Sequence, residues 1–135
     1  MSKQLILYVE DDALSREIMA LVIEDLPMYE LLMLADSVDF QKRIEALTII
    51  PTLILLDIHV QPMTGFDMLE LLKSLPGYSD VPVLALTASV MSEEITRLRK
   101  AGFNGAIAKP IDQDNFAHHI ERVLAGNLVW VIDNH

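Results

Sequence analysis

Short apolar runs along this chain end in reactive side chains, and this pattern constrains the fold most strongly. One run ends at Asp57, and the first run of the chain leads into Glu10 and Asp11. Of two later runs, one ends at Thr87 and the other is followed directly by Lys109. Ligands of parallel sheets bind in the crevice outside the carboxyl ends of the strands. If these runs are strands of one parallel sheet, three acids, a hydroxyl and an amine therefore share one site.

Apolar runs alternate with segments of helical spacing five times. The runs read as strands at residues 5–9, 30–34, 52–56, 83–86 and 106–108. The segments between and after them predict helices at residues 13–26, 36–47, 66–75, 92–101 and 112–125. Continuous apolar strands are expected where helices cover both faces of a parallel sheet. Right-handed crossovers then give a doubly wound, three-layer α/β sandwich.

The helix boundaries rest on capping residues and on apolar spacing. The first helix places Leu14, Ile18, Leu21 and Val22 on one face, with Asp12 as a possible cap. Caps for the later helices are expected at Asp36 or Ser37 and at Asp112.

Composition narrows the class of protein. The chain has 135 residues, 52% of them hydrophobic, which suits one domain with a core. It has no cysteine, and its formal net charge of −10 argues against nucleic acid as a direct partner. No apolar run is long enough to cross a bilayer, and the N-terminus does not read as a signal peptide. A soluble, cytoplasmic protein is expected.

Five short motifs, in this order on this strand pattern, resemble the receiver domain of response regulators, the CheY-like superfamily of two-component signalling. The motifs are residues 9–12 (VEDD), 55–59 (LLDIH), 63–65 (MTG), 86–88 (LTA) and 109–110 (KP). The resemblance covers residues 3 to about 125. It implies a flavodoxin-like sheet of five parallel strands in the order 2-1-3-4-5, with five helices. We expect a receiver domain at residues 1–126, a short apolar tail at 127–135 and no output domain.

The resemblance also implies roles for individual residues. Asp57 is the expected phosphoacceptor, and Pro110 is expected to follow a cis peptide bond. Mg²⁺ (or Mn²⁺) is the expected cofactor. Its expected ligands are Glu10, Asp11, Asp57 and the backbone carbonyl of His59. The expected phosphoryl-binding groups are Thr87, Lys109 and the backbone of Ala88.

The chemistry of these side chains agrees with those roles. A carboxylate can attack phosphorus and form an acyl phosphate. Phosphoryl transfer depends mostly on positioning and on charge neutralisation. Mg²⁺ prefers oxygen ligands. Three carboxylates are balanced by one ammonium group and one Mg²⁺, so the cluster is acidic without the metal and neutral with it.

The chain departs from the family pattern at two places. Position 106 is Ala, where the family usually has a Tyr or Phe whose ring moves inward when the threonine engages the phosphoryl group. Ala106 cannot serve as that switch, so we expect the loop after Thr87 and the helix from Ser92 to carry the signal. In the loop after Asp57, Gln61 holds the place where many relatives have proline.

These observations predict a single-domain response regulator. It would accept a phosphoryl group from a histidine kinase or a histidine phosphotransfer protein and then bind a downstream protein target. It would act as a monomer or weak dimer and would turn over no external substrate. One alternative is an interaction module that works without phosphorylation, which Ala106 favours. Another is a receiver fragment of a larger regulator or hybrid kinase.

Two enzyme-like or ligand-binding readings fit less well. An aspartyl-phosphate hydrolase needs a second acid two residues after the nucleophile, and that position is His59. A nucleotide- or flavin-binding protein would need a Gly-rich loop after the first strand, which the sequence lacks. The apolar residues 128–132 could pack on the domain, extend a sheet edge or form a dimer contact.

Overall fold

Six parallel strands form one sheet in this computed structural model, which describes residues 3–88 and 91–132. The strands are β1 (Gln4–Val9), β2 (Tyr29–Leu34), β3 (Leu53–Asp57), β4 (Val83–Thr87), β5 (Gly105–Ala108) and β6 (Val129–Val131). The helices are α1 (Ala13–Glu24), α2 (Phe40–Glu45), α3 (Gly65–Ser74), α4 (Ser92–Ala101) and α5 (Phe116–Leu124). The strand order is β2-β1-β3-β4-β5-β6.

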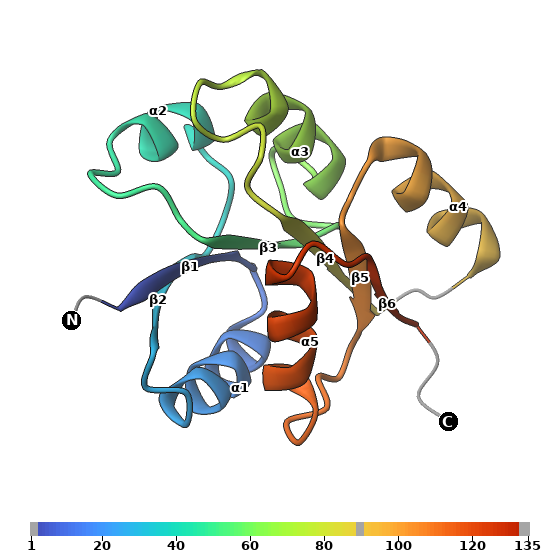
Figure 1. Ribbon diagram of the computed structural model, residues 1–135. Coiled ribbons are helices and arrows are strands. Elements are labelled where there is room, and N and C mark those ends of the chain that lie inside the picture. The colour runs from blue at the N-terminus through green and yellow to red at the C-terminus, as the bar shows by residue number, and fades with distance from the viewer. Residues whose placement is uncertain (1–2, 89–90, 133–135) are drawn as a thin grey trace.

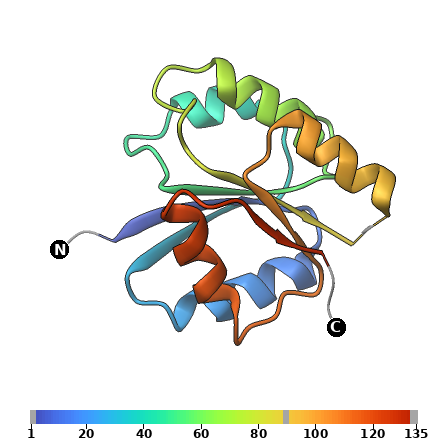
Figure 2. The same ribbon diagram turned by 45° about the vertical axis from the view of Figure 1, so that its right-hand side comes forward.

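Helices cover both faces of this sheet. α2, α3 and α4 lie on one face, and α1 and α5 lie on the other (Figures 1 and 2). The chain winds from β1 outward to β2 and then returns past β1 to β3, so the order reverses between β1 and β3. The predicted doubly wound α/β sandwich and the order of the first five strands are confirmed.

The expected five-stranded sheet is corrected to six strands, because part of the predicted tail is the edge strand β6. β6 pairs in parallel with β5, with Gly105 opposite Val129 and Ile107 opposite Val131. The backbone N–H of Val129 also donates to the carbonyl of Asn104 at 3.0 Å. Of the three arrangements left open for the tail, the structure shows extension of its own sheet.

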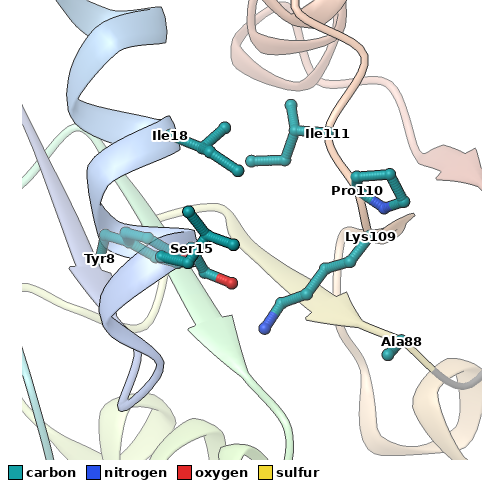
Figure 3. A pocket seen from close by; sticks show the side chains of 8 residues that line it. Tyr8, Ser15, Ile18, Ala88, Lys109, Pro110 and Ile111 are labelled. Atoms are coloured by element: carbon teal, nitrogen blue, oxygen red, sulfur yellow. The ribbon is translucent and has the colours of Figure 1, made fainter.

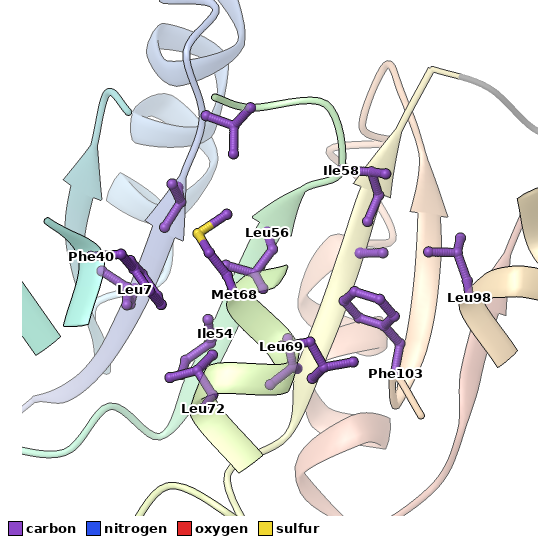
Figure 4. Packing of buried hydrophobic residues seen from close by; sticks show 14 of the residues in the cluster. Leu7, Phe40, Ile54, Leu56, Ile58, Met68, Leu69, Leu72, Leu98 and Phe103 are labelled. Atoms are coloured by element: carbon purple, nitrogen blue, oxygen red, sulfur yellow. The ribbon is translucent and has the colours of Figure 1, made fainter. Parts of the chain in front are cut away.

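The core lies in two layers, one on each side of the sheet. β3 and β4 are buried along their whole lengths, which explains why their sequences are continuous apolar runs. On the α2–α3–α4 side, Leu7, Ile54 and Leu56 pack with Met68 and Leu72 (Figure 4). Burial of each such side chain is worth about 1.5–3 kcal/mol, so this layer holds the strands in register beneath the site.

The apolar face predicted for α1 is rotated relative to the observed one. Leu14 and Leu21 are 63% and 60% exposed, whereas Met19, Val22 and Ile23 are buried. Leu14 and Leu21 are seven residues apart, so they lie on one line along the helix. That line borders the buried face rather than forming its centre.

The predicted cap of α2 is corrected, because the helix begins later than expected. α2 starts after Asp39, which adopts the left-handed conformation and makes no side-chain cap. Asp36 instead binds Arg43 at 2.8 Å. The hydroxyl of Ser37 donates to the carbonyl of Met63 at 2.7 Å and accepts from its N–H. Asp36 thus holds the segment before α2 by a contact within that region, and Ser37 holds it by a contact 26 residues away.

The ends of three other helices show which caps the sequence did and did not reveal. Asp12 caps α1 by accepting from the N–H of Ser15 at 2.9 Å. Asp112 was expected to cap α5, but it caps the preceding turn, and Asn115 is the residue before the helix. The capping box of α3, which begins at Thr64, was not predicted.

Candidate functional site

The predicted site residues meet at the carboxyl ends of the central strands. Glu10 directly follows β1, Asp57 ends β3, Thr87 ends β4 and Lys109 directly follows β5. Asp11 lies in the loop between β1 and α1. The position fits the reversal of strand order between β1 and β3, where the loops on the two sides diverge and leave a crevice.

Three carboxylates form a compact acidic group here. One carboxylate oxygen each from Glu10, Asp11 and Asp57 lies within 4.8 Å of the others. Glu10 and Asp57 are buried, and Asp11 is exposed, so the group opens to solvent on one side. An all-oxygen donor set with one open side suits Mg²⁺, which keeps several waters. The residues present therefore fit the metal that the sequence predicts.

Glu10 is the most enclosed acid of the group. Its Oε1 accepts a hydrogen bond from the Tyr8 hydroxyl at 2.7 Å and binds Nζ of Lys109, and its Oε2 accepts from the N–H of Asp12 at 3.3 Å. Burial raises the pKa of Glu10, and contact with Asp57 raises that pKa further, while Lys109 and Tyr8 oppose the shift. The donors from Tyr8 and Lys109 offset part of the cost of burying this charge.

Tyr8 was read from the sequence as part of a core strand, and its role at the site was missed. Burial is the main cause that raises the pKa of the Tyr8 hydroxyl, and the hydrogen bond to Glu10 raises that pKa further. The hydroxyl therefore stays protonated and donates to the carboxylate. Residues two apart on a strand lie on the same face, which brings Tyr8 beside Glu10. The contact was missed because a tyrosine within an apolar run also fits a purely packed position.

Lys109 lies between two acids. Its Nζ binds Glu10 and is 3.6 Å from Oδ2 of Asp57. The backbone N–H of Lys109 donates to the carbonyl of Thr87 at 2.9 Å, which fixes the end of β5 against β4. The peptide bond to Pro110 is cis, as predicted.

The segment after Asp57 is packed closely beneath the site. Oδ1 of Asp57 accepts from the backbone N–H of His59 at 3.2 Å, so the other carboxylate oxygen faces Lys109. The N–H of Gly65 donates to the carbonyl of Ile58 at 3.0 Å. A Cβ at Gly65 would lie 2.9 Å from Cα of Ile58, so a glycine is needed where α3 begins.

Glu94, in the first turn of α4, is a site neighbour that the sequence did not reveal. Its Oε1 accepts from the Thr87 hydroxyl at 3.3 Å and lies 3.4 Å from Nε2 of His59. An acid in a first helical turn is explained by the helix dipole alone. Its contact with Thr87 depends on how α4 packs against the sheet, and the sequence pattern does not predict that packing.

A cavity of about 300 Å³ lies beside Lys109, between α1 and the loop that follows β5. Figure 3 shows Ile18 and Ile111 near each other on one side of this cavity, with the amine of Lys109 below them. Ala88 is exposed and also lines the cavity. Thr87, which precedes it and ends β4, is fully buried.

Ala106 lies away from this crevice, in the middle of β5, where it is fully buried. Its register partners are Ala85 in β4 and Trp130 in β6. Residues 89 and 90, in the loop that we expect to carry a signal, lie outside the described residues.

Among the residues that the structure describes, no helix is long and apolar enough to span a membrane.

Comparisons with known proteins point to one family of domains. A family model described as the response regulator receiver domain matches residues 6–121. The signal transduction histidine-protein kinase BarA of Escherichia coli K12 is 29% identical over 123 residues, which are 90% of this chain but 13% of BarA. The polar-differentiation response regulator DivK of Brucella ovis is 34% identical over 74 residues, covering 55% of this chain and 60% of DivK.

Solved structures show the same fold. The receiver domain of sensor histidine kinase PA1611 from Pseudomonas aeruginosa, which has magnesium in its active site cleft, has a TM-score of 0.80 at 22% identity and covers 92% of this chain and 99% of its own. The chemotaxis response regulator CheY4 of Vibrio cholerae has a TM-score of 0.79 at 22% identity and covers 90% of this chain and 99% of its own.

Proposed function

The chain belongs to the response regulator receiver domain family, and we propose that it accepts a phosphoryl group on Asp57 with the help of Mg²⁺ or Mn²⁺. One observation carries this proposal. Carboxylate oxygens of Glu10, Asp11 and Asp57 lie within 4.8 Å of one another, and Lys109 Nζ is 3.6 Å from Oδ2 of Asp57. The group therefore combines a nucleophile, a place for a divalent cation and a fixed positive charge.

Asp57 would act as the nucleophile of the transfer. Oδ2 of Asp57 attacks the phosphorus of a phosphohistidine, a P–O bond forms, and the P–N bond breaks with its electron pair left on the imidazole. The product is an acyl phosphate on Asp57. The N–H of His59 already occupies Oδ1, which leaves Oδ2 as the attacking atom. The bound cation would neutralise developing charge on the phosphoryl oxygens.

The remaining groups bind the product. Glu10 and Asp11, with Asp57 and the carbonyl of His59, would hold the cation. The ammonium of Lys109 would pair with a phosphoryl oxygen. The hydroxyl of Thr87 would donate to a second oxygen, with the backbone at Ala88 beside it.

We propose that the phosphoryl donor is a histidine kinase or a histidine phosphotransfer protein and that the phosphorylated form binds a downstream protein target. The chain would turn over no external substrate, would act in the cytoplasm and would be a monomer or weak dimer. The likeness to a segment of BarA supports the alternative that this receiver works within a larger regulator or hybrid kinase.

Mass spectrometry tests the proposal. The protein is incubated with Mg²⁺ and acetyl phosphate, and we expect one added phosphoryl group that is stable in acid and labile in base. Asp57→Asn should show none. Asp12→Asn is the matched control, because Asp12 caps α1 outside the acidic group and asparagine caps equally well. Failure of the wild-type protein to gain the group, or equal labelling of Asp57→Asn, would refute the proposal.

Ala106 favours a second function, an interaction module that binds its partner without phosphorylation. The affinity for the target, measured with and without acetyl phosphate, separates the two functions. For the proposed regulator, the treatment changes the affinity of the wild type and leaves that of Asp57→Asn unchanged. For the interaction module, the treatment changes neither affinity.

A further inference from the structure

Ala106 presents a single methyl group to a part of the core that lies under α4. It is fully buried and belongs to the apolar cluster that also contains Ile95 and Leu98 of α4. Because β5 contributes no large side chain at this position, another residue must complete the packing between the sheet and α4.

Trp130 of β6 lies next to Ala106. The two residues are register partners in adjacent parallel strands, so their side chains emerge on the same face of the sheet. Trp130 is partly buried and packs against the apolar cluster that includes Ala106. The guanidinium of Arg99, in the last turn of α4, lies 4.2 Å from the centre of the indole ring. β6 thus brings an aromatic ring to the face where β5 has only a methyl group.

α4 also reaches the site at its other end. Glu94 in its first turn accepts from the hydroxyl of Thr87 at 3.3 Å. A hydroxyl has one proton to donate. If phosphoryl oxygens beside Asp57 take that donor, Glu94 loses it and faces a second negative group. One helix therefore contacts the site through Glu94 and the indole through Arg99.

We propose that Trp130 supplies the aromatic ring that β5 lacks at Ala106 and that, through α4, it registers whether Asp57 carries a phosphoryl group. This inference rests on the proposed function. When Thr87 turns from Glu94 to the phosphoryl group, α4 shifts, and Arg99 moves relative to the indole. The surface formed by α4 and β6 then changes, and a target protein can distinguish the two states there.

The packing half of the inference is tested without phosphorylation. Ala106→Tyr, Trp130→Ala and the double variant are compared by thermal melting followed by circular dichroism. If one space serves both rings, Ala106→Tyr lowers Tm in the wild-type background and raises Tm in the Trp130→Ala background. Equal losses of Tm in both backgrounds would mean that the two side chains do not share the space, and the inference would be overturned.

The coupling half uses tryptophan fluorescence, because the sequence has one Trp. With Mg²⁺ and acetyl phosphate, we expect a saturable shift in the emission of Trp130. Asp57→Asn should show no shift, and Arg99→Gln should reduce the shift several-fold. Arg97→Gln is the matched control, since Arg97 also lies on α4 but stacks on Phe66 at 4.5 Å, and it should keep the wild-type response.

The outcomes separate the inference from the proposed function. A phosphoryl adduct seen by mass, with unchanged Trp130 emission, overturns the coupling while the proposed function stands. If no adduct forms, the proposed function fails and the coupling falls with it. The comparison of Ala106→Tyr in the two backgrounds still decides whether Trp130 fills the space beside Ala106.

Discussion

Lys109 illustrates how single residues set the resting state of the site. Its amine binds the fully buried Glu10 and lies farther from Asp57, at 3.6 Å. The hydroxyl of Tyr8 donates to the same carboxylate at 2.7 Å, so Glu10 would keep one donor if the amine turned toward the phosphoryl group that we propose on Asp57. Tyr8 therefore lets Lys109 change partners without leaving the buried carboxylate unpaired.

The acidic group implies a first prediction, on Asp11. Glu10, Asp11 and Asp57 repel one another when no cation is present, because their oxygens lie within 4.8 Å. Asp11→Asn should therefore raise the stability of the metal-free protein and abolish its stabilisation by Mg²⁺. In the wild type, Mg²⁺ at 100 times its Kd should add about 2.7 kcal/mol to the free energy of unfolding.

Thermal melting with and without Mg²⁺ checks this prediction. Asp12→Asn, one residue along, is the control and should keep the full Mg²⁺ shift, because the Asp12 side chain caps α1 and is not in the acidic group. An equal Mg²⁺ shift in Asp11→Asn and the wild type would remove Asp11 from the metal site.

A second prediction concerns Gly65, which lies close behind Asp57. An added Cβ would lie 2.8 Å from Cδ1 and 2.9 Å from Cα of Ile58, and 3.1 Å from the carbonyl oxygen of Asp57. Backbone atoms cannot yield as a side chain can, so Gly65→Ala should cost about 1–3 kcal/mol and slow phosphorylation of Asp57. Urea unfolding and the rate of mass gain measure the two effects, and a wild-type rate would show that Asp57 had not moved.

At the residue level, the sequence predicted what lies at strand ends and missed what depends on tertiary packing. Glu10, Asp57 and Lys109 were found because a strand pattern and a change from apolar to charged residues are both local. Glu94 was missed because its partner Thr87 is brought near only when α4 packs on the sheet. Tyr8 was missed because its hydroxyl points to the site while its ring reads as core.

At the level of elements, the pairing of β6 with β5 requires a glycine at position 105. An added Cβ at Gly105 would lie 1.8 Å from the carbonyl oxygen of Val129, so the two strands could not pair with any larger residue there. Gly105→Ala should therefore displace β6, lower the stability and expose Trp130. Acrylamide quenching of the Trp130 emission measures the exposure, and unchanged quenching would contradict the prediction.

Truncation provides the control for this prediction. Deleting the residues after Asn127 should lower stability without changing the oligomeric state, because β6 pairs with its own domain. In the truncated protein, Gly105→Ala should cost much less than in the full chain, since no Val129 carbonyl remains to be displaced. Analytical ultracentrifugation and thermal melting together check both statements.

The buried central strands were predictable, whereas the edge strand β6 and the start of α2 were not. β3 and β4 are buried on both faces, so their apolar runs have one interpretation. The three residues of β6 are too few to show a period, and an apolar tail fits a strand, a packed coil or a dimer contact equally well. α2 has only six residues, and its start at Phe40 depends on the left-handed Asp39 and on the bond of Ser37 to Met63 rather than on a cap.

At the level of the whole molecule, which has a net charge of −10, the acidic side chains do not all stabilise the fold. Hydrogen bonds from Ser15, Val38 and Asn115 are the main causes that lower the pKa values of three carboxyls near the surface. These are Asp12, Asp36 and Asp112. A lowered pKa means stability that is present above the pKa of the unfolded chain and is lost as pH falls through the folded value.

The pKa of Glu10 is shifted in the opposite direction, upward, and this difference leads to the last prediction. Its raised pKa means that its charge opposes folding at neutral pH, and that protonation relieves this cost as pH falls through the folded value. Without metal, the free energy of unfolding should therefore rise as pH is lowered from 7 and then fall below about pH 4, where aspartates titrate. Chemical denaturation across this range should show a maximum. In Glu10→Gln the rise in the free energy of unfolding should vanish, because glutamine carries no charge to neutralise, while the loss of stability below about pH 4 should remain. If Glu10→Gln kept the wild-type maximum, the rise would belong to another group.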